Sequence, residues 1–148
     1  MRQNIRRLRG RMPVTELSEK LTALGRPIPP LGLRRIEDGS RRVDVDDLTS
    51  LALALDVSPV TLLMPYTETD DEPAEVTGRA EAVKASILWD WLRTASTLHG
   101  PDGGDDGRSA ILLEWVTWVR RAAPSWSNRE IVGRIERMIT EGGDRGDH

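Results

Sequence analysis

Apolar residues recur at intervals of three and four positions through the first 66 residues of the chain, and this spacing is typical of amphipathic helices. The pattern predicts five short helices, at about 3–11, 13–24, 30–38, 44–55 and 58–63. Asp44 and Ser58 are predicted to cap the last two, because short polar side chains accept hydrogen bonds from the free N–H groups at a helix start. Gly25 and Gly39 are predicted to end the second and third helices.

The second and third predicted helices carry the clearest apolar faces. In helix 13–24 we expect one buried stripe, made of Val14, Leu17, Leu21 and Leu24. In helix 30–38 we expect Leu33 and Ile36 to face inward. The outward face of the same helix then carries Leu31, Arg34, Arg35 and Asp38.

A different pattern begins after residue 66. Residues 67–78 are acidic and have no apolar stripe, so we expect a linker there. Three further helices are predicted at about 79–98, 109–122 and 127–140. The predicted fold class is all-α, with a five-helix domain at 1–66 and a small helical C-terminal module at 79–148.

The distribution of charge distinguishes the two ends of the chain. The net charge is −3, but residues 1–42 hold eleven Lys or Arg against four Asp or Glu, a net charge of +7. Residues 67–148 hold ten basic against sixteen acidic residues, a net charge of −6. A strongly basic first part favours a polyanionic partner for that part alone.

Composition excludes several classes of site. The chain has no Cys, so it has no disulfide, no thiolate metal ligand and no Cys nucleophile. No apolar run approaches the roughly 18 residues of a membrane span, and no apolar segment follows the basic start as in a secretory signal. We therefore expect a cytoplasmic protein without a membrane partner.

The remaining candidates for catalysis or metal binding are weak. His99 and His148 stand alone, and the spacing of Asp102, Asp105 and Asp106 is not that of a calcium-binding loop. The group Asp44, Asp46 and Asp47 is better interpreted as favourable charge at a helix N-terminus than as a metal site. We expect no catalytic residue, no metal and no cofactor, and hence no enzyme.

One stretch resembles a known family. It reads Leu33-Arg34-Arg35-Ile36-Glu37-Asp38-Gly39, followed by the basic pair Arg41-Arg42 and by Asp44 at the start of the next helix. This resembles the lambda-repressor-like helix-turn-helix regulators (the XRE or Cro/C1 type), especially those of actinobacteria, and the likeness covers about residues 4–65. Two features depart from the family pattern: Pro29-Pro30-Leu31-Gly32 replaces a polar first turn, and the connection at 25–29 is longer.

The resemblance implies a sequence-specific transcriptional regulator, repressor-like, which binds double-stranded DNA as a homodimer with helix 30–38 in the major groove. Arg35 is then expected to bond a guanine, and Leu31 to contact a thymine methyl group. The residues expected to hold or attract phosphates are Arg34, Arg41, Arg42, Arg6, Arg7 and Arg9. Glu37 is expected to be structural, paired with an arginine or a helix-end donor.

All five tryptophans follow residue 88, and there is no Phe. We expect most of them in the core of the C-terminal module. Trp89 and Trp91 are about 200° apart on a helix, however, so one buried face cannot hold both. Trp89, Leu92 and Trp118 are therefore candidates for a subunit interface or for a site that binds a protein or small-molecule effector. An alternative function is a non-enzymatic interaction module, such as an antitoxin or adaptor that binds its partner through these tryptophans.

Overall fold

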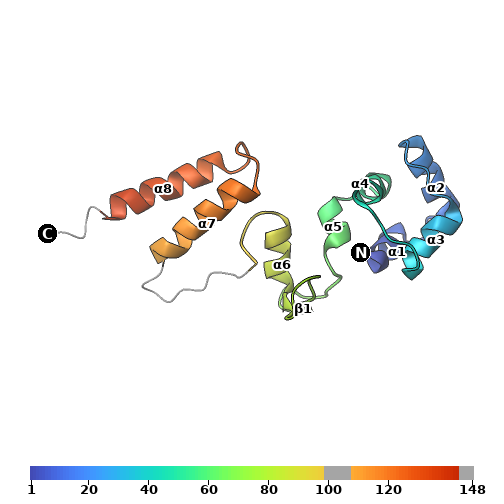
Figure 1. Ribbon diagram of the computed structural model, residues 1–148, viewed down its shortest axis with the longest axis horizontal. Coiled ribbons are helices and arrows are strands. Elements are labelled where there is room, and N and C mark those ends of the chain that lie inside the picture. Colours follow the sequence, from blue (N-terminus) through green and yellow to red (C-terminus); the bar gives the residue numbers. More distant parts are fainter. Residues whose placement is uncertain (99–107, 144–148) are drawn as a thin grey trace. The chain divides into compact units, whose positions relative to one another are not determined.

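The computed structural model describes residues 1–98 and 108–143, with side chains described for 1–98 and 111–137 (Figure 1). The chain divides into two compact units, Met1–Glu68 and Thr69–His148, which are called here the first and the second unit. Two expectations lie outside the described residues: those for the aspartates of the 99–107 segment and those for the two histidines.

The first unit contains the five expected helices (Figure 1, blue to green). They are α1 Arg2–Arg9, α2 Val14–Ala23, α3 Pro30–Asp38, α4 Val45–Ala54 and α5 Pro59–Leu63. A single core holds them together, and its buried residues are Ile5, Leu17, Leu21, Ile28, Leu33, Ile36, Leu51, Ala52, Ala54 and Leu62. The described part of the chain is thus mainly helical, as the apolar spacing predicts.

Local chemistry explains where these helices begin and end. Asp44 accepts a hydrogen bond from the backbone N–H of Asp47, so it caps α4 as expected, and Ser58 caps α5 in the same way. Gly25 has φ +77, a left-handed conformation that glycine adopts without strain, and it ends α2 as predicted. Asp56, with φ 54, has the corresponding place after α4.

The apolar stripe predicted for α2 is correct except at its last position. Leu17 and Leu21 are fully buried, whereas the side chain of Leu24 is 47% exposed. Leu24 is the C-cap residue of α2, where the chain already turns toward Gly25, so it no longer follows the helical register. Ile28 occupies the core instead, although it lies in the connection between α2 and α3.

The second unit begins with extended backbone where a linker and a helix were expected. Strand β1, Pro73–Ala74, pairs antiparallel with β2, Val83–Lys84. The carbonyls of Asp70 and Glu72 then accept hydrogen bonds from Ser86 (2.8 Å) and Ala85 (2.9 Å), at the first turn of α6, Ala85–Leu92. The acidic stretch is therefore hydrogen-bonded to the helix that follows it.

The predicted helix 79–98 is wrong at both ends. It begins late because Val83 and Lys84 are extended and paired with β1. It ends early because Thr94 adopts φ 59, which lets the N–H of Ala95 bond to the carbonyl of Asp90 (2.7 Å) in the turn that closes α6. The apolar spacing through this region continues past both ends, which is why the pattern alone suggested a longer helix.

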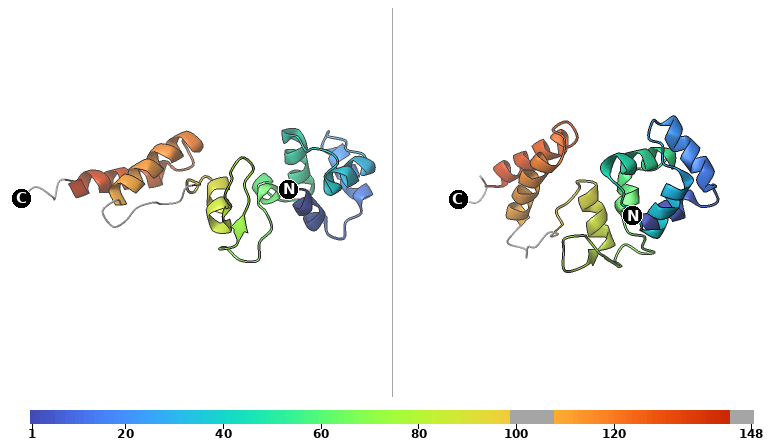
Figure 2. Two further views of the ribbon diagram at one scale, coloured as in Figure 1. Left: turned by 60° about the horizontal axis from the view of Figure 1, so that its bottom comes forward. Right: turned by 45° about the vertical axis from the view of Figure 1, so that its right-hand side comes forward.

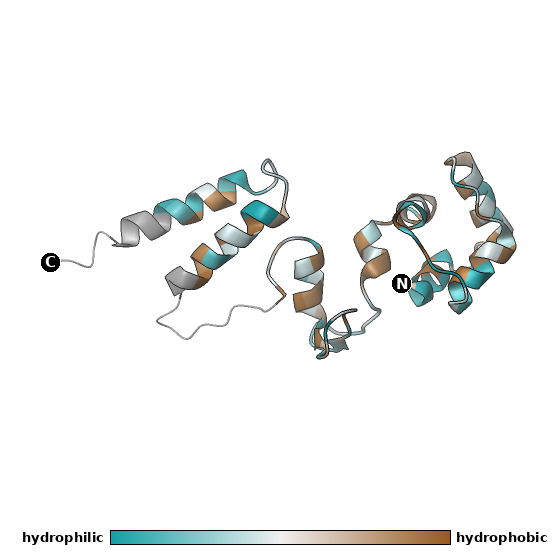
Figure 3. Ribbon diagram, viewed as in Figure 1, coloured by the Kyte–Doolittle hydropathy of each residue, from teal (hydrophilic) through white to brown (hydrophobic). Residues whose placement is uncertain are grey.

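The last two helices are α7, Arg108–Ala122, and α8, Arg129–Gly143, close to their predicted ranges. They pack together through Val116, Val119 and Val132. Both hydrophobic and hydrophilic residues lie along each of them (Figure 3). None of the helices in the described part of the chain has the length and apolar character that crossing a membrane requires.

The buried face of α6 holds aliphatic residues rather than its tryptophans. Ala85 and Leu88 are buried at 2% and 3% exposure, whereas Ile87 and Trp91 are only partly buried. Among the described residues, no tryptophan belongs to the fully buried core, and Trp126 is 77% exposed. The expectation that most tryptophans form the core is therefore wrong: small and branched residues occupy the centre, and the larger indoles pack at its edge.

Candidate nucleic-acid interface

The two faces of α3 have the residues that the sequence predicts. Leu33 and Ile36 are buried at 0% and 1% exposure. Helix α3 lies against α1 and α2 (Figure 2). On the opposite face Leu31 is 60% exposed, and Arg34 and Arg35 are exposed as well. The helix thus turns a basic and apolar surface to solvent.

Some arginines of the first unit are free to meet a ligand. Within the part of the chain that the structure describes, the guanidinium groups of Arg6, Arg34 and Arg42 make no hydrogen bond or ion pair. All three side chains are exposed. Arg7 is also exposed, and its guanidinium lies 5.1 Å from the ring centre of Tyr66, a cation–π contact that leaves its N–H groups available.

Arg9 has a different role, because it is paired with Glu37. Its Nε and Nη2 atoms donate to the two carboxylate oxygens at 2.6 and 3.0 Å, and the two side chains are only 15% and 10% exposed. Hydrogen bonding to Glu37 raises the pKa of Arg9, so its charge is permanent. The pair joins α1 to α3, which agrees with the structural role expected for Glu37.

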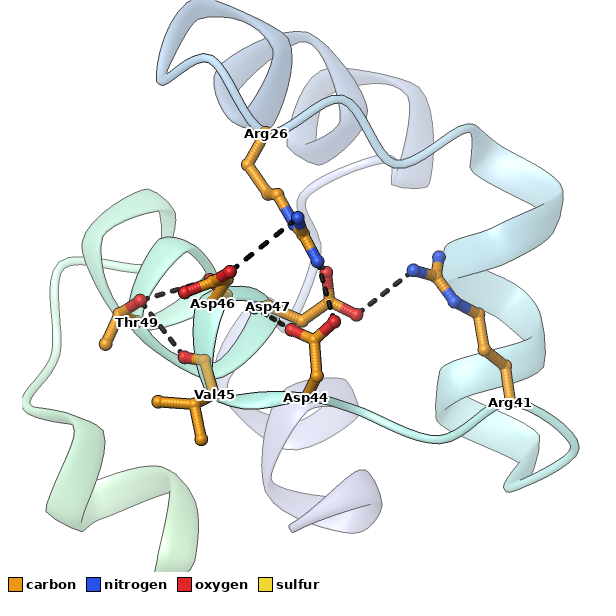
Figure 4. Close-up of polar contacts among 7 residues, drawn as sticks. All are labelled: Arg26, Arg41, Asp44, Val45, Asp46, Asp47 and Thr49. Atoms are coloured by element: carbon orange, nitrogen blue, oxygen red, sulfur yellow. Dashed lines mark hydrogen bonds and ion pairs between the residues drawn. The ribbon is translucent and has the colours of Figure 1, made fainter.

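A second network joins the α2–α3 connection to the start of α4 (Figure 4). Asp47 is 1% exposed, and its two carboxylate oxygens accept from Nε of Arg26 and Nη2 of Arg41, both at 3.0 Å. Arg26 also donates to Asp44 at 2.7 Å and lies 3.9 Å from Asp46. The buried carboxylate of Asp47 is thus paired with two arginines, and loss of either arginine would leave a buried charge less well compensated.

Hydrogen bonds shift the pKa values of two residues in this network. The backbone N–H of Asp47 donates to Asp44 at 2.7 Å and lowers the pKa of Asp44, with a smaller effect from the charge of Arg26. The hydrogen bond to Asp47 raises the pKa of Arg26. Both shifts favour the charged forms of Asp44 and Arg26.

The side chain of Arg41 passes close to Gly32 of α3, and its guanidinium donates to Asp47. A Cβ atom at Gly32 would lie 3.0 Å from Nη1 of Arg41 and 3.2 Å from Cγ2 of Ile28. A side chain here would displace the arginine or press on the core. Gly32 therefore has a packing reason in this chain.

The turn after α3 is also closely held. Gly39 has φ +86, and Asp38 accepts from the hydroxyl (2.6 Å) and the backbone N–H (2.8 Å) of Ser40. These bonds lower the pKa of Asp38, and the charge of Arg35 adds to the effect. The turn gives the basic pair that follows α3 a defined starting direction.

Three structural residues have roles that the sequence does not indicate. Asn4 is 2% exposed, and its Nδ2 donates to the backbone carbonyls of Thr61, Leu62 and Met64. Arg26 and Asp47 are the other two. Asn4 lies 57 or more residues from its partners, and Arg26 and Asp47 lie 21 residues apart, so spacing could not identify these contacts.

In the second unit, the candidate interface residues have different surroundings. Trp89 and Leu92 are partly buried, on the side of α6 that also carries the buried Ala85 and Leu88, and the guanidinium of Arg93 lies 5.3 Å from the Trp89 ring. Trp118 lines a groove of about 780 Å³ on α7. The structure therefore does not bring these three side chains together into one exposed patch.

Comparisons with protein families, with characterised proteins and with solved structures each find no match to this chain.

Proposed function

We propose that the chain is a sequence-specific transcriptional regulator, repressor-like, whose first unit binds double-stranded DNA with α3 in the major groove. The observation that carries the proposal is the outward face of α3. Leu31, Arg34 and Arg35 are exposed there while the core holds the opposite face. This leaves a rigid helix with basic side chains directed away from the protein.

The dimensions of α3 suit this role. Its nine residues give a length of about 13 Å, and the major groove of B-form DNA is wide enough to admit a helix. The core, the Arg9–Glu37 pair and the turn at Gly39 fix α3 relative to α1 and α2. A helix held in this way loses little conformational freedom on binding.

We assign two kinds of contact to the free side chains. Arg35 bonds O6 and N7 of a guanine, and Leu31 packs on a thymine methyl group. Arg34 and Arg42 hold phosphates, which sets the register of the helix without reading sequence. Arg6 and Arg7 add electrostatic attraction for the DNA, whereas Arg9 has a structural role because it is paired with Glu37.

Arg41 and Arg42 differ in whether they have an ion-pair partner. Arg41 donates to Asp47 and its side chain is 35% exposed, so its replacement would disturb α4 as well as any phosphate contact. Arg42 is exposed and makes no ion pair within the described residues. Arg42 is therefore the cleaner position at which to test phosphate binding.

The test begins with selection of bound duplexes from a random DNA pool by the full chain. Affinity for the selected site is then measured over a range of salt concentrations. Arg35→Ala should lose discrimination at one base pair, by roughly 1–3 kcal/mol, while Arg42→Ala should weaken all sequences alike and reduce the salt dependence by about one counterion. Arg134→Ala, an exposed arginine of the second unit, is the control with the same change in charge.

The failure of the proposal is easy to recognise. If no sequence is enriched and no duplex binds at low salt, the chain is not a DNA-binding regulator. If Arg35→Ala and Arg134→Ala have equal effects, α3 is not the reading helix. We further propose that two copies bind one two-fold operator, because one short helix contacts few base pairs; paired half-sites in the selected DNA would support this.

A second candidate function, a protein-interaction module, is favoured by the exposure of Trp126 (77%), Leu113 (56%) and Ile131 (52%) in the second unit. Large apolar side chains are common at the centres of protein interfaces. Binding of a protein through such residues responds little to salt, whereas DNA binding weakens steeply. The salt dependence of a measured complex therefore distinguishes the two functions.

A further inference from the structure

The second unit has a groove of about 780 Å³, within the usual size range of small-molecule sites. Two tryptophans line it, Trp91 from the last turn of α6 and Trp118 from α7. Leu98 and Leu113 add apolar surface, and Glu114 and Arg121 add opposite charges. These residues define what is called here the Trp91–Trp118 groove.

Two contacts hold the walls of the groove. Nε1 of Trp115 donates to the carbonyl of Ala95 at 2.7 Å, which joins α7 to the turn that follows α6. Val116 and Val119 are buried against α8. On a helix these two valines lie about 140–160° from Glu114, so packing against α8 leaves the face of Glu114 and Arg121 on the other side, and Trp118 lies at the edge of the valine core.

The charged groups of the groove have no ion-pair partner in the part of the chain that the structure describes. Glu114 and Arg121 are exposed, and neither makes an ion pair with a described residue. They are seven residues apart on α7, about 10 Å along its axis, so each lies toward a different end of the groove. Arg120, the neighbour of Arg121, is by contrast paired with Glu136 of α8 at 2.5 Å.

We propose that the Trp91–Trp118 groove binds planar aromatic cations. Indole rings stack on aromatic ligands and attract cations more strongly than the other aromatic side chains do. Glu114 supplies the opposite charge at one end, and the net charge of −6 over residues 67–148 favours a cation over an anion. Arg121 repels positive charge from its own end, so the charged atom of the ligand lies beside Glu114.

The test uses three probes of nearly equal shape and different charge: N-methylquinolinium, neutral quinoline and quinoline-2-carboxylate. Binding to the full chain, without DNA, is measured by calorimetry at neutral pH, and the indole N–H signals are followed by NMR. N-methylquinolinium should bind at least about fivefold more tightly than quinoline, and the carboxylate should bind most weakly. The signals of Trp91 and Trp118 should shift, and that of the exposed Trp126 should not.

Variants test the individual contacts. Glu114→Gln should weaken N-methylquinolinium about fivefold and leave quinoline unchanged. Trp91→Leu should weaken both probes, because it removes a stacking surface, and Trp126→Leu is the matched control that should change neither. Circular dichroism of each variant shows whether the helices remain formed.

Three results would overturn the proposal. The first is that no probe binds, and the second is equal or tighter binding of quinoline or of the carboxylate. The third is an equal loss of affinity in Trp91→Leu and Trp126→Leu, which would indicate adsorption to exposed indoles. Since no DNA is present in these measurements, their outcome is independent of the proposed function of α3.

Discussion

Replacement of Asn4 by Ala is expected to destabilise the first unit strongly, although Asn4 lies near the chain terminus and contacts no proposed ligand. Asn4 is 2% exposed, and its Nδ2 donates to the carbonyls of Leu62 at 3.0 Å, of Thr61 at 3.4 Å and of Met64. The last carbonyls of a helix have no partner within the helix, so the side-chain amide of Asn4, from α1, supplies the hydrogen bonds that the carbonyls at the end of α5 lack.

The magnitude follows from the number of donors. The amide has two protons, and each neutral hydrogen bond contributes about 1 kcal/mol to the free energy of unfolding. The bond to Leu62 is buried, so its carbonyl is left without water or a donor, at a further cost of about 1–3 kcal/mol. The expected loss is about 3–5 kcal/mol, a large part of the roughly 5–15 kcal/mol of an ordinary domain.

The two units can be followed separately in the full chain. All five tryptophans lie after residue 88, so tryptophan fluorescence reports on the second unit, while circular dichroism reports on the helices of both. In urea, Asn4→Ala should shift the dichroism transition and leave the fluorescence transition in place. Gln3→Ala, at the exposed neighbouring position on α1, is the control. A loss below about 0.5 kcal/mol, no greater than that of the control, would refute the hydrogen-bonding argument.

Three further predictions concern the elements that hold α3. In a double-mutant cycle, Arg9→Met and Glu37→Gln should give a coupling free energy of about 1–3 kcal/mol. The exposed pair Lys20–Glu16 is the control and should give roughly 0.3–0.5 kcal/mol. Equal coupling energies for the two pairs would contradict a role for burial. Gly39→Ala should lower the free energy of unfolding, measured in urea, by about 1–2 kcal/mol because the φ of Gly39 is +86. Adding Arg2→Ala should not restore this loss, since the guanidinium of Arg2 near Gly39 can move and is not its cause. The pKa of Asp44 lies below its ordinary 3.8 in the folded protein, so the stabilising effect of its charge is complete above pH 3.8 and is lost as the pH falls through the lowered pKa. Asp44→Asn should therefore make the free energy of unfolding less dependent on pH in this acid range. An unchanged dependence on acid pH would count against the capping bond.

The sequence was sufficient where local chemistry and periodicity agree. Helix α3 has the bounds that its Pro30 start, apolar pair and Gly39 end predict, and its exposed face is the one expected. Both caps at Asp44 and Ser58 were also predictable, because a cap depends only on residues a few positions away. Over residues 79–84 the same apolar spacing gave a wrong prediction, since it cannot exclude an extended segment that pairs with another strand.

What the sequence by itself determined is therefore the helices of the first unit, the inward and outward faces of α3, and the basic character of that unit. Only the tertiary structure decided which arginines remain free. Arg9 meets Glu37 from 28 residues away and Arg26 meets Asp47 from 21, while Arg34 and Arg42 meet no described partner. The four arginines have the same side chain, so composition and spacing cannot distinguish the paired ones from the free ones. The difference arises because an ion pair needs two groups within about 4 Å, and packing of the helices around the core sets that distance.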